Sequence, residues 1–369
     1  MSGRDPDGPA AIADGLIEAT RRMVRLAGRL GEAGAGQPVE IVETPSTPVW
    51  ADGKISLRRY RAGEAPDPAL GPIVIVHGLI GRQTMLDLEP RRSFVRRMLA
   101  AGVDTYAADW GMPTRADRWR DTTDYAVDAL GDMLAAIERL TGAPRAVLMG
   151  ICQGGVFALA HAALFPDRVK GLVLAVTPVD FHADMAEPRI GRGQLNHWLR
   201  TLPVELIDRL IEDGGNVPGA LTAAIFNGLT PGRWTARYTA DLAEIADDPA
   251  ALDTFLRMEK WLADRPDQPG ALAREWMVDL YRENHLVRGQ WRLDGRRVDL
   301  ADVACPVMNV YARDDHIVPP PCTRALKGYL RNVAYRELEV PTGHVGAFVS
   351  ARAQDIVAPA VVEWLAETA

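Results

Sequence analysis

One six-residue stretch, Gly150-Ile-Cys-Gln-Gly-Gly, constrains the fold of this chain more than any other feature. An apolar, strand-like run over 145–149 precedes it, and a helix-like run over 156–164 follows it. A nucleophile between glycines at a strand-to-helix junction forms the sharp turn called a nucleophile elbow. We expect a Cβ at Gly150 or Gly154 to collide across this turn, and Gly155 to let the helix pack closely. Cys152 is therefore the predicted nucleophile, where most elbows carry serine; the alternative is a buried structural cysteine.

Strands and helices are predicted to alternate on both sides of the elbow. The run at 73–76 is continuously apolar, which is typical of a buried parallel strand. Such alternation indicates βαβ units and a mostly parallel sheet with helices on both faces. The other predicted strands are 104–108, 171–176, 306–311 and 334–340, and the other predicted helices are 92–100, 123–140 and 353–367.

The pattern divides the chain into four segments. Residues 1–60 are predicted to hold an amphipathic helix at 11–30 and short β-type runs at 39–43 and 55–60. Residues 61–182 form the first part of the α/β core. The alternation then stops, so that 183–300 reads as a helical cap insertion over the active site, and 301–369 complete the core.

Composition narrows the classes of function. The net charge of −7, without a long basic run, argues against a nucleic-acid surface. Three cysteines in so long a chain indicate reduced thiols rather than a disulfide framework. We expect a cytoplasmic protein because the chain shows no signal peptide and no transmembrane segment. We expect no metal and no cofactor, because neither ligand-spaced His/Cys clusters nor a Gly-rich phosphate loop is present.

A base and an acid are predicted to follow the nucleophile in the order nucleophile, acid, histidine. His344 lies between Gly343 and Gly346 after the last predicted strand, and is the candidate base. The strand at 306–311 runs into both Asp314 and Asp315, and spacing alone barely separates these two candidate acids. His316 is a supporting candidate. All lie after strands, where the ligand sites of α/β sheets are found.

The predicted oxyanion hole uses two backbone N–H groups. One belongs to Gln153, directly after the nucleophile, and the other to Ile80 in the loop after the first core strand. A cysteine nucleophile also indicates the substrate. Attack of a thiolate on a thioester exchanges one sulfur ester for another of similar energy, so the acyl group stays activated for transfer to an alcohol. Cysteine therefore hints at acyl transfer from a thioester such as an acyl-CoA.

Several motifs beyond the elbow give the chain a specific resemblance. From about residue 40 to the end it resembles the catalytic subunits of class III polyhydroxyalkanoate synthases, which have an α/β-hydrolase fold. The matching stretches are Gly150-Ile-Cys-Gln-Gly-Gly, Asp109-Trp-Gly, Thr177-Pro-Val-Asp-Phe, Phe255-Leu-Arg-Met-Glu-Lys-Trp, Pro266-Asp-Gln, Asp315-His-Ile-Val-Pro-Pro and Gly343-His-Val-Gly. The stretch at 255–261 discriminates most, because it lies in the insertion.

The resemblance implies roles for particular residues. Cys152 would carry the acyl group, His344 would activate it, and Asp315 would be the acid, helping to activate the 3-hydroxyl of the incoming unit directly or through the histidine. It implies polymerisation of (R)-3-hydroxyacyl-CoA, such as 3-hydroxybutyryl-CoA, with release of CoA. It also implies a non-catalytic second subunit of the PhaE type, attachment to polyester granules in the cytoplasm, and a possible homodimer.

Two other classes of function compete with a synthase. One is a cysteine-dependent hydrolase on the same scaffold, either a thioesterase or a polyhydroxyalkanoate depolymerase. The loop His77-Gly-Leu-Ile-Gly departs from the synthase pattern and looks more like that of an ordinary hydrolase. The other is a catalytically idle scaffold or granule-binding protein, which an intact set of Cys152, Asp315 and His344 argues against.

Overall fold

The computed structural model describes residues 40–368, except 42–43, 62, 64, 187–193, 230–231, 233–235 and 246. The predicted helix at 11–30 lies outside the described residues. So does most of the β-type run at 39–43, of which residues 40 and 41 are described and are not in a strand.

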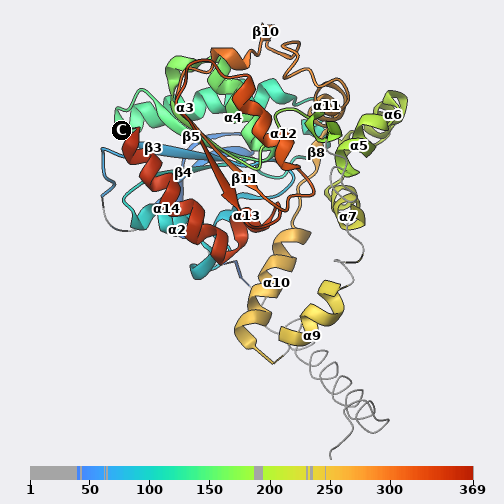
Figure 1. The fold of residues 1–369 in the computed structure, drawn as a ribbon, viewed down its shortest axis with the longest axis horizontal. Coiled ribbons are helices and arrows are strands. Elements are labelled where there is room, and N and C mark those ends of the chain that lie inside the picture. Colours follow the sequence, from blue (N-terminus) through green and yellow to red (C-terminus); the bar gives the residue numbers. More distant parts are fainter. Residues whose placement is uncertain are drawn as a thin grey trace, which may run out of the picture.

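An eight-stranded sheet forms the centre of the molecule (Figure 1). Its order is β1-β2-β4-β3-β5-β6-β11-β12. β1 and β2 pair antiparallel with their neighbours, and the other six strands of this sheet are parallel to one another. The strands are β1 (Ser46–Asp52), β2 (Ile55–Tyr60), β3 (Pro72–Val76), β4 (Asp104–Asp109), β5 (Ala146–Ile151), β6 (Val169–Ala175), β11 (Val307–Ala312) and β12 (Tyr335–Val340). The predicted mostly parallel sheet is confirmed. The sequence groups residues 1–60 apart from the core, but β1 and β2 are part of the same sheet.

Helices cover both faces of the sheet because successive strand residues point to opposite sides. Val74 and Val76 belong to the cluster that includes α3 (Leu130–Thr141) and α4 (Gln153–Leu164). Ile73 and Ile75 pack with α2 (Phe94–Ala100), α13 (Gly346–Val349) and α14 (Ala351–Glu367). Figure 1 shows these two groups on opposite sides of the strands. The predicted α/β-hydrolase architecture, with helices on both faces, is therefore observed.

The insertion between β6 and β11 is mainly helical, as predicted. In Figure 1 its helices α5, α6 and α7 lie beside the sheet, and α9 and α10 extend away from it. Sequence analysis missed four two-residue strands there: β7 (Asn216–Val217) pairs with β8 (Gln268–Pro269), and β9 (Arg292–Leu293) with β10 (Arg296–Arg297). In the described part of the chain, the α- and π-helices between β6 and β12 are α5 (Gln194–Thr201), α6 (Val204–Gly214), α7 (Gly219–Leu229), a short π-helical turn (Arg237–Asp241), α9 (Leu242–Ile245), α10 (Pro249–Ala263), α11 (Gly270–Glu275), a π-helical segment (Trp276–Arg282) and α12 (Pro320–Arg324).

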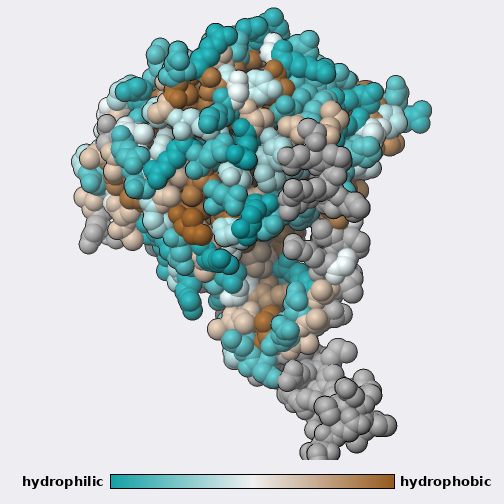
Figure 2. All heavy atoms as spheres, in the orientation of Figure 1, coloured by the Kyte–Doolittle hydropathy of each residue, from teal (hydrophilic) through white to brown (hydrophobic). Residues whose placement is uncertain are grey.

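The surface is mixed in character. On the face shown in Figure 2, hydrophilic residues dominate the body around the sheet, with separate hydrophobic patches between them. None of the helices in the described part of the chain is long and apolar enough to cross a membrane.

Candidate active site

Cys152 occupies a strained turn between β5 and α4. Its φ of 52° and ψ of −119° place a non-glycine residue at positive φ, a conformation that is costly and that clusters at functional sites. The flanking glycines are required by close approach. A Cβ at Gly150 would lie 2.4 Å from the Cα of Gly155, and one at Gly154 would lie 2.2 Å from the carbonyl oxygen of Val76. The local sequence thus folds into the elbow that the spacing predicts.

His344 and Asp315 meet beyond the ends of two neighbouring strands. Asp315 follows β11 and His344 follows β12, so parallel pairing brings their loops together. The Nδ1 of His344 is 2.7 Å from Oδ2 of Asp315. The other carboxylate oxygen accepts the backbone N–H groups of Ile317 at 2.9 Å and Val318 at 2.8 Å. These bonds fix a carboxylate that is almost completely buried, and the carboxylate in turn orients the imidazole.

The structure separates the two neighbouring aspartates. The side chain of Asp314 is 49% exposed and lies 3.7 Å from the Nε of Arg313, whereas that of Asp315 is 1% exposed and holds His344. Of the two aspartates, therefore, Asp315 is the one that contacts His344, and the geometry favours it as the candidate acid.

The charge state of His344 reflects two opposing effects. Burial lowers the pKa of its imidazole. The charge of Asp315, the interaction with Cys152 and the hydrogen bonds to both residues raise it by more, so that the pKa lies well above its usual value. In general, a histidine beside a cysteine can take the thiol proton and leave the thiolate, which is the nucleophilic form. Cys152, His344 and Asp315 can thus act as nucleophile, base and orienting acid.

The two predicted oxyanion donors lie around Cys152. Gln153 is the first residue of α4, where helix N–H groups have no acceptor within the helix. Ile80 lies in the loop after β3 and lines two cavities, each of which also contains Cys152. The neighbouring Leu79 N–H donates to the side-chain oxygen of Gln153 at 2.9 Å, which ties this loop to the elbow.

Two further histidines near the site differ in their surroundings. His316 lines the larger cavity beside Cys152, in keeping with a supporting position. His77 is buried, and burial lowers the pKa of its imidazole. Its Nδ1 lies 2.7 Å from the carbonyl oxygen of Gly78, so the ring contacts the loop after β3.

Cys152 lies where two cavities meet. The larger has a volume of about 470 Å³ and includes Arg237, Arg265 and His316 in its wall. The smaller, of about 340 Å³, is walled largely by aliphatic and aromatic side chains of α5, α6 and α7, with Trp276 and Tyr281 of the π-helical segment. Both contain Ile80, Cys152, Phe226 and Ile317. One nucleophile can thus be reached from a cavity with cationic groups and from an apolar one.

Arg265 is a cation that sequence analysis missed. Its guanidinium lies 5.3 Å from the ring centroid of Phe226 and donates through Nε to the carbonyl oxygen of Leu262. Burial lowers its pKa, and within the described part of the chain no carboxylate forms an ion pair with it. An anionic ligand group in the larger cavity could satisfy this charge.

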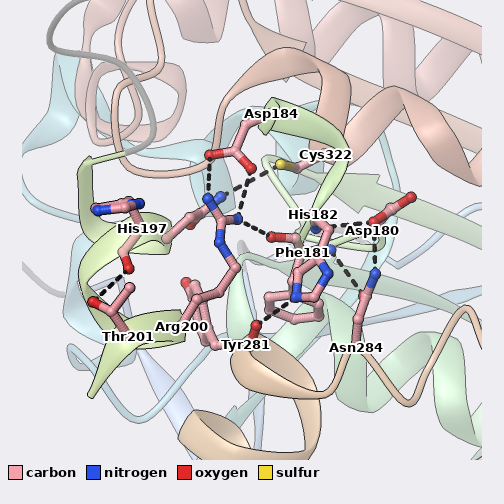
Figure 3. Close-up of polar contacts among 11 residues, drawn as sticks. Asp180, Phe181, His182, Asp184, His197, Arg200, Thr201, Tyr281, Asn284 and Cys322 are labelled. Carbon is pink, nitrogen blue, oxygen red and sulfur yellow. Dashed lines mark hydrogen bonds and ion pairs between the residues drawn. The ribbon is translucent and has the colours of Figure 1, made fainter. Parts of the chain in front are cut away.

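A polar network anchors the insertion to the core beside the site (Figure 3). Arg200 of α5 binds Asp184 at 2.8 Å and donates to the carbonyl oxygen of Phe181 at 2.7 Å. Asn284 donates to Asp180 at 2.8 Å and accepts the backbone N–H of Phe181. Sequence analysis quoted the stretch at 177–181 but did not predict these contacts, because their partners are far away in the chain.

The other cysteines are unlike Cys152. Burial raises the pKa of Cys305 to about 11 and that of Cys322 to about 12. The Cys322 sulfur accepts a hydrogen bond from Asn196 at 3.5 Å, within the network of Figure 3. Neither borders the two cavities. Among the described residues, no group of three or more His, Cys, Asp or Glu side chains converges as metal ligands would.

Comparison with known proteins identifies relatives of this chain. A family model described as the alpha/beta hydrolase fold matches residues 71–351. The chain is 36% identical over 353 residues to the poly(3-hydroxyalkanoate) polymerase subunit PhaC of Allochromatium vinosum, covering 94% of this chain and 97% of the relative. It is 37% identical over 333 residues to the subunit of the same name from a Synechocystis strain, covering 89% and 86%.

Among solved structures, the chain is similar to a monoacylglycerol lipase from Paleococcus ferrophilus. The TM-score is 0.51 at 20% sequence identity, over 84% of this chain and 99% of the lipase. At that identity the likeness supports the fold alone.

Proposed function

Because the chain belongs to the PhaC family of poly(3-hydroxyalkanoate) polymerase subunits within the α/β-hydrolase fold, we propose that it is a catalytic subunit that polymerises (R)-3-hydroxyacyl-CoA and releases CoA. The resemblance that the motifs indicated is thereby confirmed at the level of the family. The observation that carries the proposed chemistry is Cys152, held at positive φ beside the His344–Asp315 pair at the junction of two cavities.

The first step is acylation of Cys152. The thiol proton passes to the Nε2 of His344, whose Nδ1 is held by Asp315. The thiolate attacks the thioester carbonyl carbon, and the resulting oxyanion accepts the N–H groups of Gln153 and Ile80. The C–S bond to CoA breaks, and the departing sulfur takes the proton from His344. The products are an S-acyl Cys152 and free CoA, and the activated acyl bond is conserved.

The second step lengthens the chain. A 3-hydroxyl group attacks the carbonyl of the acyl chain on Cys152 and gives its proton to His344. An oxoester bond forms while the bond to the Cys152 sulfur breaks, and the thiol recovers its proton from His344. His344 can carry out both proton transfers, because its ring lies beside the Cys152 thiol and is held by the buried carboxylate of Asp315.

The two cavities suit the two partners of this reaction. CoA carries phosphates, and the larger cavity contains Arg265, a cation without an acidic partner in the described residues. A polyester chain is aliphatic and uncharged, which matches the apolar walls of the smaller cavity. We therefore assign the thioester to the larger cavity and the acyl chain to the smaller one.

The proposal extends to assembly and location. The relatives are named as subunits of a polymerase, so we propose that this chain works with a second, non-catalytic subunit. Its water-insoluble product places it at the surface of polymer granules in the cytoplasm.

The test is a CoA-release assay with (R)-3-hydroxybutyryl-CoA, with and without a candidate second subunit, followed by analysis of the acyl product. The proposal expects polyester of high mass, which is lost in Cys152→Ala. Free 3-hydroxybutyrate without polymer, even with the second subunit, would instead establish a thioesterase. Release of neither product would support a catalytically idle protein.

A further inference from the structure

A buried pair of glutamine side chains connects the insertion to the elbow. Gln153 is completely buried at the start of α4, and Gln268 is 7% exposed in β8 of the insertion. The Nε2 of Gln153 donates to the Oε1 of Gln268 at 3.3 Å. Both residues therefore lie in the interior, between the catalytic elbow and the cap.

The orientation of both amides follows from one backbone group. The N–H of Leu79 can only donate, so the atom of Gln153 that faces it at 2.9 Å must be the oxygen. The nitrogen of Gln153 then faces Gln268, which must present its own oxygen. The two hydrogen bonds therefore run in one direction. They lead from the Leu79 N–H through the Gln153 amide to the Gln268 amide, which lies at the far end.

This chain of hydrogen bonds acts on the loop that carries the candidate oxyanion donor. The next peptide after Leu79 bears the N–H of Ile80, and Ile80 borders both cavities beside Cys152. Gly78 leaves room for the arrangement, because a Cβ there would lie 2.7 Å from the Cβ of Gln153. The Gln153 amide therefore holds the Gly78–Leu79 peptide, and through it the adjoining Leu79–Ile80 peptide.

Gln268 is itself held firmly in the insertion. Its strand pairs with β7 through Val217, and the adjacent Asp267 accepts the N–H of Gly219 at 2.9 Å. Two residues of α11 bind the core, since Ala271 and Leu272 donate to the carbonyl oxygens of Arg118 and Arg120. The Nε2 of Gln268 has no hydrogen-bond partner in the described part of the chain, which costs stability.

We propose that Gln153 and Gln268 are a positioning pair that sets the Leu79–Ile80 peptide in the oxyanion hole, so that the cap controls stabilisation of the tetrahedral intermediate. Neither side chain touches the reacting atoms; Gln153 acts through the peptide, and Gln268 acts through Gln153. The inference rests on the proposed acyl transfer at Cys152 and adds how that site is assembled.

The test compares two reactions of the same thiolate. Acylation of Cys152 by p-nitrophenyl butyrate passes through an oxyanion, whereas alkylation by iodoacetamide does not. In Gln268→Met, the single-turnover acylation rate should fall about tenfold, less than the loss of a whole oxyanion donor. The alkylation rate at Cys152, followed by mass spectrometry, should stay within about twofold of that of the wild-type protein.

Two further variants separate positioning from packing. Gln354→Met makes the same replacement at another buried glutamine, in α14, and should leave both rates unchanged. The double variant Gln153→Met/Gln268→Met should acylate no more slowly than Gln153→Met alone, because Gln268 acts through Gln153. Additive losses, parallel losses of acylation and alkylation, or no loss in Gln268→Met would each overturn the proposal. A wild-type protein that is acylated but makes no polymer would refute the proposed function without affecting this test.

Discussion

At the scale of single residues, burial and side-chain direction determine which of the adjacent residues Asp314 and Asp315 contacts His344. Asp314 and Asp315 have the same chemistry and adjacent positions, yet only Asp315 is buried against His344. Two backbone N–H groups hold one of its oxygens and thereby aim the other at the imidazole. The contrast supplies a matched pair of variants.

Asp315→Asn should lower kcat/KM on the order of a thousandfold, whereas Asp314→Asn should stay within about twofold. The charge of Asp315 raises the pKa of His344, so its removal lowers that pKa. The imidazolium of His344 is then lost at lower pH. The pH profile of the His344 ring signals, followed by NMR, should therefore shift to lower pH in Asp315→Asn. An unchanged profile would contradict this electrostatic link.

The sequence alone indicates a candidate nucleophile and a candidate base, but not the residues that hold them in place. Cys152 was predicted from flanking glycines, and His344 from chain order, because both signals are local. The choice between Asp314 and Asp315 depended on the family resemblance, since spacing is blind to side-chain direction. The Gln153–Gln268 contact joins residues 115 positions apart, and no local pattern indicates it.

At the scale of secondary structure, the packing of α4 against the loop after β6 leaves no space for a side chain at Gly155. A Cβ there would lie 1.9 Å from the Oγ1 of Thr177 and 2.7 Å from its Cγ2. The glycine thus sets how closely the helix behind the nucleophile approaches the sheet.

Gly155→Ala should lower the free energy of unfolding by about 1–3 kcal/mol, because helix and loop must separate. Gly228→Ala in α7 is the matched control, since a Cβ there has no atom within 4 Å. It should stabilise the protein by up to about 1 kcal/mol through helix propensity. Denaturant unfolding of both variants provides the measurement, and equal effects of the two would refute the steric explanation.

Glu275, at the end of α11, links the insertion to Thr122 of the core. Its carboxylate accepts the N–H of Thr122 at 2.8 Å and also the hydroxyl, yet burial raises its pKa from 4.5 to about 7. Between these values the folded protein binds more protons than the unfolded chain, so stability falls as pH rises. The total loss is roughly 3 kcal/mol above the upper end of this window.

Glu275→Gln should remove this pH dependence while keeping an oxygen for Thr122. The variant should melt at a higher temperature than the wild-type protein, by a margin that grows as the pH rises from 5 to about 7.5. Glu212→Gln, at an exposed position of α6, serves as the control. Thermal unfolding across this pH range would disprove the assignment if the two variants behaved alike.

At the scale of the whole molecule, the apolar cavity continues to an exposed rim. Leu206 and Leu210 of α6 are 54% and 37% exposed, and both border the cavity that reaches Cys152. A growing aliphatic chain could follow this path without exposure to charge. We therefore expect the side chains at this rim to influence the length that a polymer reaches before it is released.

Leu206→Glu should shorten the polymer while leaving the first acylation of Cys152 unchanged, because the charge stands at the mouth of the cavity and not at the thiol. Arg209→Glu places the same side chain at an exposed position of α6 that does not border this cavity, and should leave polymer length unaltered. Size-exclusion analysis of the extracted polymer gives the readout. Equal lengths from both variants would argue against this path.

The overall architecture was more predictable than the insertion. Buried parallel strands are continuous apolar runs, so the core strands and their alternation with helices along the chain could be inferred. The edge strand β1 was missed, because its burial pattern is mixed and its pairing depends on β2. The two-residue strands β7 and β8 are too short to have a sequence signal, although β8 carries Gln268.

The insertion separates Cys152 from Asp315 and His344 in the order of synthesis as well as in the sequence. β6 and β11 are hydrogen-bonded neighbours, although roughly 130 residues lie between them. Loop-closure entropy rises only with the logarithm of loop length, so the cap can lengthen or shorten at little cost without displacing acid and base. During synthesis, Cys152 is made well before Asp315 and His344. A partly made polypeptide therefore carries Cys152 without the His344–Asp315 pair, which forms only when β11 and β12 join the sheet.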